Sequence, residues 1–253
     1  MDEIGSYVFT AGGTSGVYGI RLRADVNRHL ILGLLNSKPL DFYLKHTSAV
    51  YAGHSYSYGD QFLKLQPIKL PRTEPEREMA QRISGLARDL IQLKDELRSK
   101  EGTLAGFPAT LLEARRRLTD IYTVRRLASG RPQAMRIRVT EASKDNRDGA
   151  WVLAFRRSVL EFPSEAHVDA CVKWLQLQER DIVGLEDLLK VRLPKRADAC
   201  RRLLSDLTAL QESITRTKRN IDQKEEELNH LVSEYYQLDA EAHRVVENFL
   251  RRF

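Results

Sequence analysis

Cysteine is scarce in this chain, whose 253 residues include only Cys171 and Cys200, without the paired spacing of a zinc site. A disulfide framework and a cysteine-based metal centre are therefore not indicated. Long apolar runs are missing too, because no stretch approaches the ~20 residues that a membrane-spanning helix needs. The first residues, MDEIGS, are acidic and lack the basic and then apolar pattern of a signal peptide. We therefore expect a cytoplasmic protein with no membrane partner.

The sequence also lacks the residue patterns of familiar catalytic sites. Its six histidines do not cluster, and no Ser-His-Asp arrangement has a supporting context. The tripeptide DQK, Asp222 to Lys224, lies in a helical repeat with no acidic strand before it, which argues against a nuclease site. We therefore expect no catalytic residue, no metal site and no cofactor in this chain.

Glycines are few, 14 in all, yet residues 7–20, YVFTAGGTSGVYGI, contain four of them. A P-loop needs a Lys-Ser/Thr pair after its last glycine, and the dinucleotide fingerprint needs G-x-G-x-x-G, so neither motif fits. Two β-rich runs joined by a glycine loop predict a hairpin instead. The loop is either a flexible turn or a segment whose N–H groups lie against a phosphate backbone.

Positive charge is concentrated in one short segment. Residues 111–138 contain eight arginines, no lysine and two acidic residues, a surplus that equals the net charge of +6 for the whole chain. Such a surplus indicates a surface that faces a polyanion, since arginine suits bidentate contacts with phosphates and bases. The alternative is a solvated, charged helix face.

Residues 7–71 have the pattern of a small mixed module. After the hairpin, an apolar stripe predicts a helix with Asp25 as its N-cap, and Pro39 is expected in the first turn of a second helix. In HSYSY, alternation places His54, Tyr56 and Tyr58 on one strand face.

Two segments have heptad spacing. The first, from Glu76, has apolar residues in steps of four and three and is expected to stop at Gly102. The second begins near residue 203 and includes two polar seam positions, Thr217 and Lys224, which either fix the register or mark the end of the pairing. Such stripes need a partner, and antiparallel pairing of the two helices with each other satisfies both.

The expected fold class is helix-rich α+β. It comprises a small mixed recognition module, long antiparallel coiled-coil helices and a second small α/β module. In the second module MRIRVTEA and AWVLAFRRSVLEF predict strands, Ser164 is expected to cap a helix, and the tail is expected to continue as helix. The expected boundaries are 1–75, 76–102, 103–196 and 197–253.

Several segments, in order, resemble a known family. They are FTAGGTSGVYGIRL, ILGLLNSKPLDFYL, YSYGDQFLKLQPIKLP and, at the end, NHLVSEYYQLDAEAHRVVENF. Together they resemble the TaqI-like C-terminal specificity domain, the target-recognition part of adenine-specific DNA methyltransferases in Type IIG restriction-modification and related phage-defence systems. The likeness covers roughly residues 7–100 and 190–253 and is weaker between them.

The resemblance implies two DNA-recognition modules joined by long helical spacers, as in Type I specificity subunits. It implies double-stranded DNA and a methyltransferase domain or subunit as partners. The chain has no NPPY-type catalytic motif and no glycine-rich motif for S-adenosylmethionine. We therefore expect a non-catalytic, carboxy-terminal or split part of a larger enzyme, with S-adenosylmethionine bound by the missing methyltransferase domain.

The residues expected to contact DNA lie in both modules. They are Gly12, Gly13, Thr14, Ser15, Tyr18, Arg21, His54, Tyr56 and Tyr58 in the first, and Arg115, Arg116, Arg117, Arg125 and Arg126 in the second. Phosphate contacts are expected of the second set, and base or shape recognition of the polar and aromatic residues of the first. The competing hypotheses are a coiled-coil scaffold or dimerisation protein and an enzyme with an unrecognised site.

Overall fold

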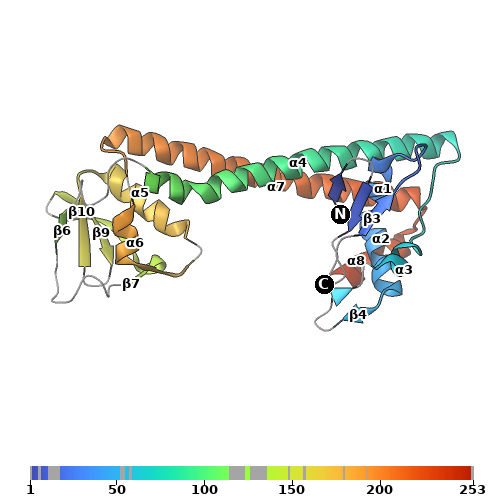
Figure 1. Ribbon diagram of the computed structural model, residues 1–253, viewed down its shortest axis with the longest axis horizontal. Coiled ribbons are helices and arrows are strands. Elements are labelled where there is room, and N and C mark those ends of the chain that lie inside the picture. The colour runs from blue at the N-terminus through green and yellow to red at the C-terminus, as the bar shows by residue number, and fades with distance from the viewer. Residues whose placement is uncertain are drawn as a thin grey trace. The chain divides into compact units, whose positions relative to one another are not determined.

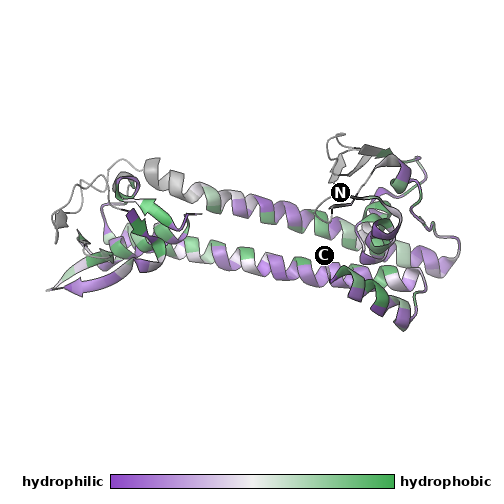
Figure 2. Cartoon of the chain, turned by 90° about the horizontal axis from the view of Figure 1, so that it is seen from below, coloured by the Kyte–Doolittle hydropathy of each residue, from purple (hydrophilic) through white to green (hydrophobic). Residues whose placement is uncertain are grey.

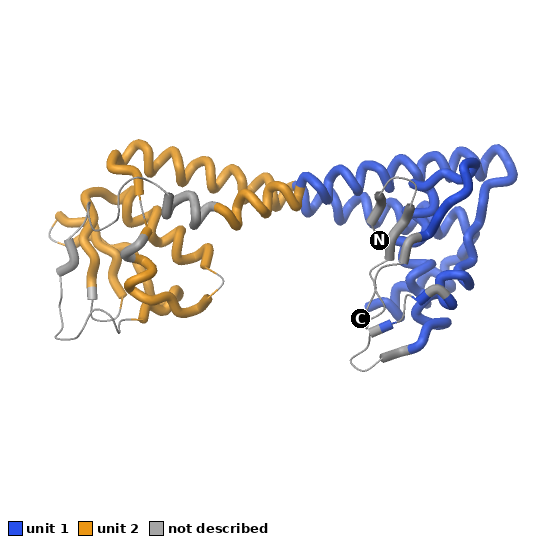
Figure 3. The backbone as a smooth tube through the Cα atoms, viewed as in Figure 1, with its two compact units in different colours: residues 1–96, 217–253 blue, residues 97–216 orange. Residues whose placement is uncertain are grey.

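The chain forms two compact units (Figure 3). Unit 1 comprises Met1–Glu96 and Thr217–Phe253, and unit 2 comprises Leu97–Arg216. The architecture is helix-rich α+β with antiparallel sheets, which confirms the expected fold class. The computed structural model describes residues 2–4, 7–10, 18–51, 55–56, 59–113, 123–125, 136–147, 149–155, 158–178, 180–191 and 193–251.

Unit 1 begins with a three-stranded antiparallel sheet in the order β1-β2-β3. Its strands are β1 (Asp2–Ile4), β2 (Tyr7–Thr10) and β3 (Tyr18–Arg21). The register pairs Tyr7 with Arg21 and Thr10 with Tyr18, which confirms the predicted hairpin. Two shorter strands, β4 (Val50–Tyr51) and β5 (Ser55–Tyr56), pair separately.

Helix α1 (Arg28–Leu35) begins one residue after Asn27. The Asn27 side-chain oxygen accepts hydrogen bonds from the backbone N–H groups of His29 (2.9 Å) and Leu30 (3.3 Å). The expectation that Asp25 is the N-cap is therefore wrong. Asp25 lies too far before the first turn, whereas Asn27 stands where a side-chain oxygen reaches the second and third N–H groups.

Close packing fixes α1 against the long helix α4 (Glu74–Glu113). A Cβ atom at Gly33 would lie 2.9 Å from Ile83 Cγ2 and 3.4 Å from the Cβ of Ala87. Glycine is thus required here by the close approach of two helices rather than by a turn. Because all residues from Leu30 to Leu35 are buried, α1 lies in the core of unit 1.

Helix α4 continues through Gly102, contrary to the expected stop at that residue. A glycine costs a helix about 1 kcal/mol relative to alanine but breaks no hydrogen bond, so the helix can pass through it. Figure 2 shows hydrophobic residues recurring among hydrophilic ones along both α4 and α7 (Ala197–Tyr235).

The two long helices are antiparallel and paired within unit 1 (Figure 1). Near the start of α4, Glu76 contacts the Lys69 ammonium, which also binds the carbonyl of Tyr235 at the end of α7. Further along α4, Asp89 lies 2.7 Å from Lys224, which stands earlier in α7. Buried seam residues of unit 1 include Ile83, Leu86 and Leu90 on α4 and Thr217, Ile221, Leu228 and Leu231 on α7. The predicted antiparallel pairing is confirmed here, and the Lys224 contact favours a register-fixing role for that residue.

The tail continues as helix, as expected, but with a break, because α7 ends at Tyr235 and α8 (Ala240–Leu250) follows. Gln237 adopts a positive φ of 58°. Its N–H donates to Glu234 O (2.9 Å), and the Leu238 N–H donates to Ser233 O (3.0 Å). This pair of bonds is the Schellman motif, which ends a helix at a left-handed residue.

Helix α8 packs on α2 (Lys38–Thr47), which has Pro39 in its first turn as predicted. The Lys38 ammonium contacts Glu247 at 2.8 Å and lowers the pKa of that carboxyl through this hydrogen bond. The rings of Phe42 and Phe249 meet edge to face at 5.1 Å. A short helix, α3 (Asp60–Leu63), precedes the chain segment that leads into α4.

Unit 2 contains a four-stranded antiparallel sheet in the order β6-β10-β9-β8 and a separate two-stranded ribbon, β7-β11. The strands are β6 (Thr123–Arg125), β7 (Arg136–Arg138), β8 (Ser143–Arg147), β9 (Ala150–Phe155), β10 (Ser158–Phe162) and β11 (Ile182–Gly184). Helices α5 (Glu165–Gln176) and α6 (Leu185–Lys190) and a 3₁₀ turn (Val139–Glu141) complete the unit. The strands expected in MRIRVTEA and AWVLAFRRSVLEF are confirmed.

Ser164 is the N-cap residue of α5, as predicted, but its hydroxyl makes no capping bond. The hydroxyl instead bonds to Nδ1 of the buried His167 (2.7 Å), and His167 Nε2 donates to Pro194 O (2.9 Å). Because a carbonyl can only accept, Nε2 carries the proton. His167 thus uses Nδ1 to hold the N-cap residue of its own helix and Nε2 to join α5 to the segment before α7.

Candidate nucleic-acid interface

The β7–β11 ribbon has one face in the core of unit 2 and one face in solvent. Its register pairs Val183 with Ile137, and both side chains are buried. Since side chains alternate along a strand, Arg136 and Arg138 lie on the opposite, exposed face. Ile182, which pairs with Arg138, is 44% exposed and adds an apolar group there.

The positive charges of this exposed face are only partly compensated. Arg138 Nη1 lies 3.4 Å from Glu141 Oε1, and both side chains are well exposed. Within the described part of the chain, neither Arg136 nor the exposed Arg180 forms an ion pair. A two-stranded ribbon fits the major groove of DNA, and arginine is the side chain best suited to its phosphates and guanines.

The cations of strand β8, at the edge of the four-stranded sheet, differ from those of the ribbon because both of them form ion pairs. Lys144 Nζ lies 2.9 Å from Glu165 and 2.7 Å from Asp169, and the hydrogen bond to Asp169 is the main cause of its raised pKa. Arg147 lies 2.8 Å from Asp145 and lowers the pKa of that carboxyl by its hydrogen bond. The charges of β8 are therefore balanced by neighbouring carboxylates.

Most residues expected to contact DNA lie outside the described part of the chain. These are Gly12, Gly13, Thr14, Ser15, His54, Tyr58, Arg115, Arg116, Arg117 and Arg126. Tyr18 and Arg21 lie in β3, and Arg21 is exposed. Arg125 lies in β6, where its backbone pairs with Val159.

Tyr56, in β5, is the described member of the expected aromatic row. Its side chain is half-buried, and Lys45 Nζ lies 5.8 Å from the centroid of its ring. A cation over the face of an aromatic ring is attracted to it electrostatically, which favours this placement of Tyr56. Sequence reasoning missed Ile182 and Arg180, because the partner of β7 lies more than 40 residues further along the chain.

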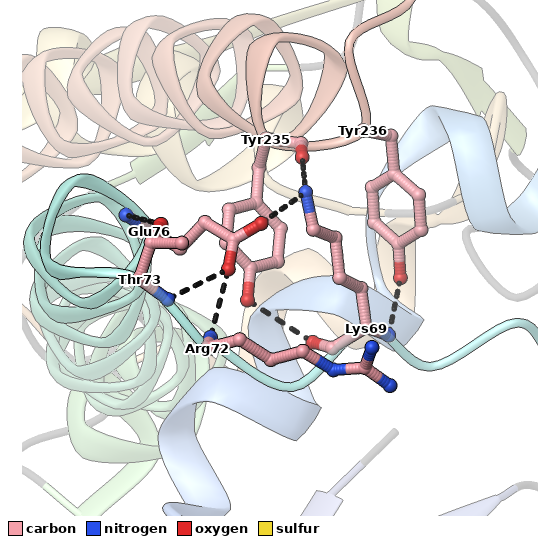
Figure 4. A network of polar contacts seen from close by, with 6 residues as sticks. All are labelled: Lys69, Arg72, Thr73, Glu76, Tyr235 and Tyr236. Atoms are coloured by element: carbon pink, nitrogen blue, oxygen red, sulfur yellow. Dashed lines mark hydrogen bonds and ion pairs between the residues drawn. The ribbon is translucent and has the colours of Figure 1, made fainter.

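A polar network, here called the Lys69 clamp, joins the segment before α4 to the end of α7 (Figure 4). It comprises Lys69, Arg72, Thr73, Glu76, Tyr235 and Tyr236. Lys69 Nζ donates to Tyr235 O (2.8 Å) and contacts Glu76 Oε1 (2.9 Å). The Tyr235 hydroxyl donates to Lys69 O (3.2 Å), so Lys69 is held at both its side chain and its backbone.

Glu76 also completes a capping box at the start of α4. Its Oε2 accepts from the backbone N–H groups of Arg72 (2.7 Å) and Thr73 (3.1 Å), while Thr73 Oγ1 accepts from Glu76 N (3.4 Å). The hydrogen bonds that the carboxylate accepts, from Arg72 foremost and then from Lys69 and Thr73, lower the pKa of Glu76 to about 2. The T-x-x-E spacing before an apolar run is a sequence signal that could have predicted this cap.

An apolar hollow of about 460 Å³ lies in unit 1 between α2 and α8. Its lining includes Phe42 and Tyr43 of α2, Tyr236, and Val245 and Val246 of α8. Tyr43 and Val245 are also among the exposed large hydrophobic side chains of the described residues. The walls come from segments about 200 residues apart, so the sequence contained no direct sign of the hollow.

Among the described residues, no group of three or more His, Cys, Asp or Glu side chains could hold a metal ion. None of the described helices is both long enough and apolar enough to cross a membrane. Comparison with known proteins found no matching family model, no matching curated protein and no matching solved structure.

Proposed function

We propose that this chain is the DNA target-recognition part of an adenine-specific DNA methyltransferase of a restriction-modification or phage-defence system. The chain binds double-stranded DNA and contains no catalytic residues. A methyltransferase domain or subunit supplies the S-adenosylmethionine site and the transfer step. The protein acts in the cytoplasm, where the DNA is.

The observation that carries the proposal is the exposed arginine face of the β7–β11 ribbon. Arg136 and Arg138 end the arginine-rich segment 111–138, and the burial of Ile137 directs both outwards. Ile182 pairs with Arg138 and lies beside it on the same exposed face of the ribbon. Arginine and aliphatic groups on one ribbon suit phosphates, base edges and thymine methyl groups.

The order of the elements gives further support. The antiparallel pairing of α4 and α7 in unit 1 agrees with the spacer helices that the sequence resemblance implies, and the strands of unit 2 lie between these two helices in the sequence. The resembling segments of the first module also overlap β2, β3, α1 and α2.

The test is selection from a pool of random duplexes. The purified chain is incubated with double-stranded oligonucleotides of random sequence, and the retained fraction is sequenced over several rounds. We expect one short motif to be enriched, with affinity at least ~10³-fold above that for random duplex. Retention without enrichment, or no retention at about 50 mM salt, would contradict target recognition.

Calorimetry with S-adenosylmethionine is the companion experiment. We expect no heat of binding at micromolar concentrations, because the cofactor site belongs to the methyltransferase domain or subunit. Binding of the cofactor would favour an enzyme with an unrecognised site. A stable dimer that retains no duplex would favour the scaffold hypothesis instead.

A further inference from the structure

The turn before α7 and the first turns of this helix contain a dense group of charges in unit 2. Four cations and one carboxylate lie within eight residues, here called the α7 basic cluster: Lys195, Arg196, Asp198, Arg201 and Arg202. All five residues are exposed, and the side chain of Arg196 is 83% exposed. The cluster lies outside the arginine-rich segment 111–138 and has a positive surplus of three.

The single carboxylate of the cluster is shared. Asp198 Oδ2 lies 3.6 Å from Arg196 Nη2, while Asp198 Oδ1 accepts a hydrogen bond from Arg201. One carboxylate cannot neutralise two guanidinium groups. In the described part of the chain, Lys195 and Arg202 form no ion pair, although Asp206 lies one helical turn beyond Arg202.

The backbone that supports the cluster is fixed from the core side. Pro194 O accepts hydrogen bonds from His167 Nε2 (2.9 Å) and from Cys200 Sγ (3.4 Å), and both donors are buried. The cations of the cluster are therefore presented on an ordered turn. Positive groups held together in this way repel one another and favour the binding of a polyanion.

We infer that the α7 basic cluster binds the phosphate backbone of double-stranded DNA. This inference rests on the proposed function and assigns part of its binding surface. Lysine and arginine bind phosphates independently of base sequence, so the cluster contributes affinity and orientation rather than sequence preference. The expected sign of such contacts is a steep dependence of affinity on salt.

The test is a salt titration with a double variant. Lys195→Gln/Arg202→Gln removes the two cations that lack a carboxylate partner among the described residues. Binding of a fluorescent random-sequence duplex is followed by anisotropy between about 50 and 200 mM salt. Each phosphate contact adds about 0.9 to the slope of log affinity against log salt, so we expect the slope to fall by about 1.8.

Lys144→Gln/Arg147→Gln is the matched control, because it removes the same charge from β8 of the same unit. These cations already have carboxylate partners, so we expect a slope close to that of the wild type. Thermal melting by circular dichroism checks that both variants fold. Equal decreases for the two variants would mean that only net charge matters and would overturn the inference.

The remaining outcomes separate the inference from the proposed function. Wild-type binding with an unchanged slope in the cluster variant overturns the inference and leaves the function standing. Absence of wild-type binding to any duplex overturns both. Tighter binding of a single-stranded oligonucleotide of the same length overturns the assignment of the cluster to double-stranded DNA.

Discussion

At the scale of single residues, Glu76 connects local and distant structure. It caps the backbone N–H groups of Arg72 and Thr73 and holds the Lys69 ammonium beside Tyr235. The carboxylate form makes all these contacts, which is why the pKa of Glu76 is lowered from 4.5 to about 2. The stabilisation is complete above about pH 4.5 and is lost as the pH falls towards 2.

We predict that Glu76→Gln removes this part of the acid sensitivity. The free energy of unfolding of the wild type should fall between pH 4.5 and 2, because protonation breaks the Lys69 contact and weakens the cap. The variant should be less stable than the wild type at pH 6 and should lose less stability over the acid range. Urea denaturation at a series of pH values measures both quantities.

Glu78→Gln is the control for this experiment, since it removes an exposed carboxylate from the same turn of α4. It should keep the acid profile of the wild type. If Glu76→Gln and Glu78→Gln gave the same profile, the Lys69 clamp would not depend on the charge of Glu76.

At the scale of elements, the contact of α1 with α4 depends on the absence of a side chain at Gly33. Ile83 is branched at Cβ, so its Cγ2 atom cannot move aside without a strained rotamer. Gly85, on α4, differs because a Cβ atom there would have no neighbour within 4 Å. Substitution of Gly85 by alanine therefore changes helix propensity alone, whereas the same substitution at Gly33 changes both helix propensity and packing.

We predict that Gly33→Ala destabilises the chain relative to Gly85→Ala. Both changes gain about 1 kcal/mol of helix propensity, while only the first adds an overlap with Ile83, which costs about 1–3 kcal/mol. The difference between the two free energies of unfolding should therefore be about 1–3 kcal/mol. Equal stability of the variants would show that α1 does not approach α4 this closely.

At the scale of the whole molecule, the long helices bury their seams within one chain. Asp89 and Lys224 stand 135 positions apart and lie 2.7 Å from each other, and a second ion pair joins Lys94 to Glu225 at 2.7 Å. A partly exposed pair of this kind contributes up to about 1 kcal/mol. The Asp89–Lys224 pair is nevertheless a useful probe, because it shows whether α4 pairs with α7 of the same chain or of another chain.

We predict that Asp89→Lys and Lys224→Asp each lower the free energy of unfolding by about 1 kcal/mol, through repulsion of like charges. The double variant Asp89→Lys/Lys224→Asp should recover most of this loss, because the swapped pair lies in the same chain. An equimolar mixture of the two single variants should recover none of it. Recovery in the mixture, measured by thermal melting, would show pairing between chains and would support the dimerisation hypothesis.

The candidate interface could be predicted only in part. The surplus of arginine indicated segment 111–138, because the charge of a segment can be counted directly from its sequence. Which arginines face outwards depends on the burial of Ile137 and Val183, and the strand that pairs with β7 comes from a distant segment. The α7 basic cluster could not be predicted, because four cations within eight residues are common in helical sequences. Only the structure shows that Asp198 pairs with both Arg196 and Arg201.

The sequence by itself determined the helix-rich α+β class, the hairpin of β2 and β3, and the antiparallel pairing of α4 with α7 in unit 1. These follow from local chemistry: hydrophobic period, glycine position and the need of an apolar stripe for a partner. The structure corrected two local expectations, because α4 passes Gly102 and Asn27, not Asp25, caps α1. Only the tertiary structure decided the Lys69 clamp, because such contacts need a register between distant segments that no local pattern specifies.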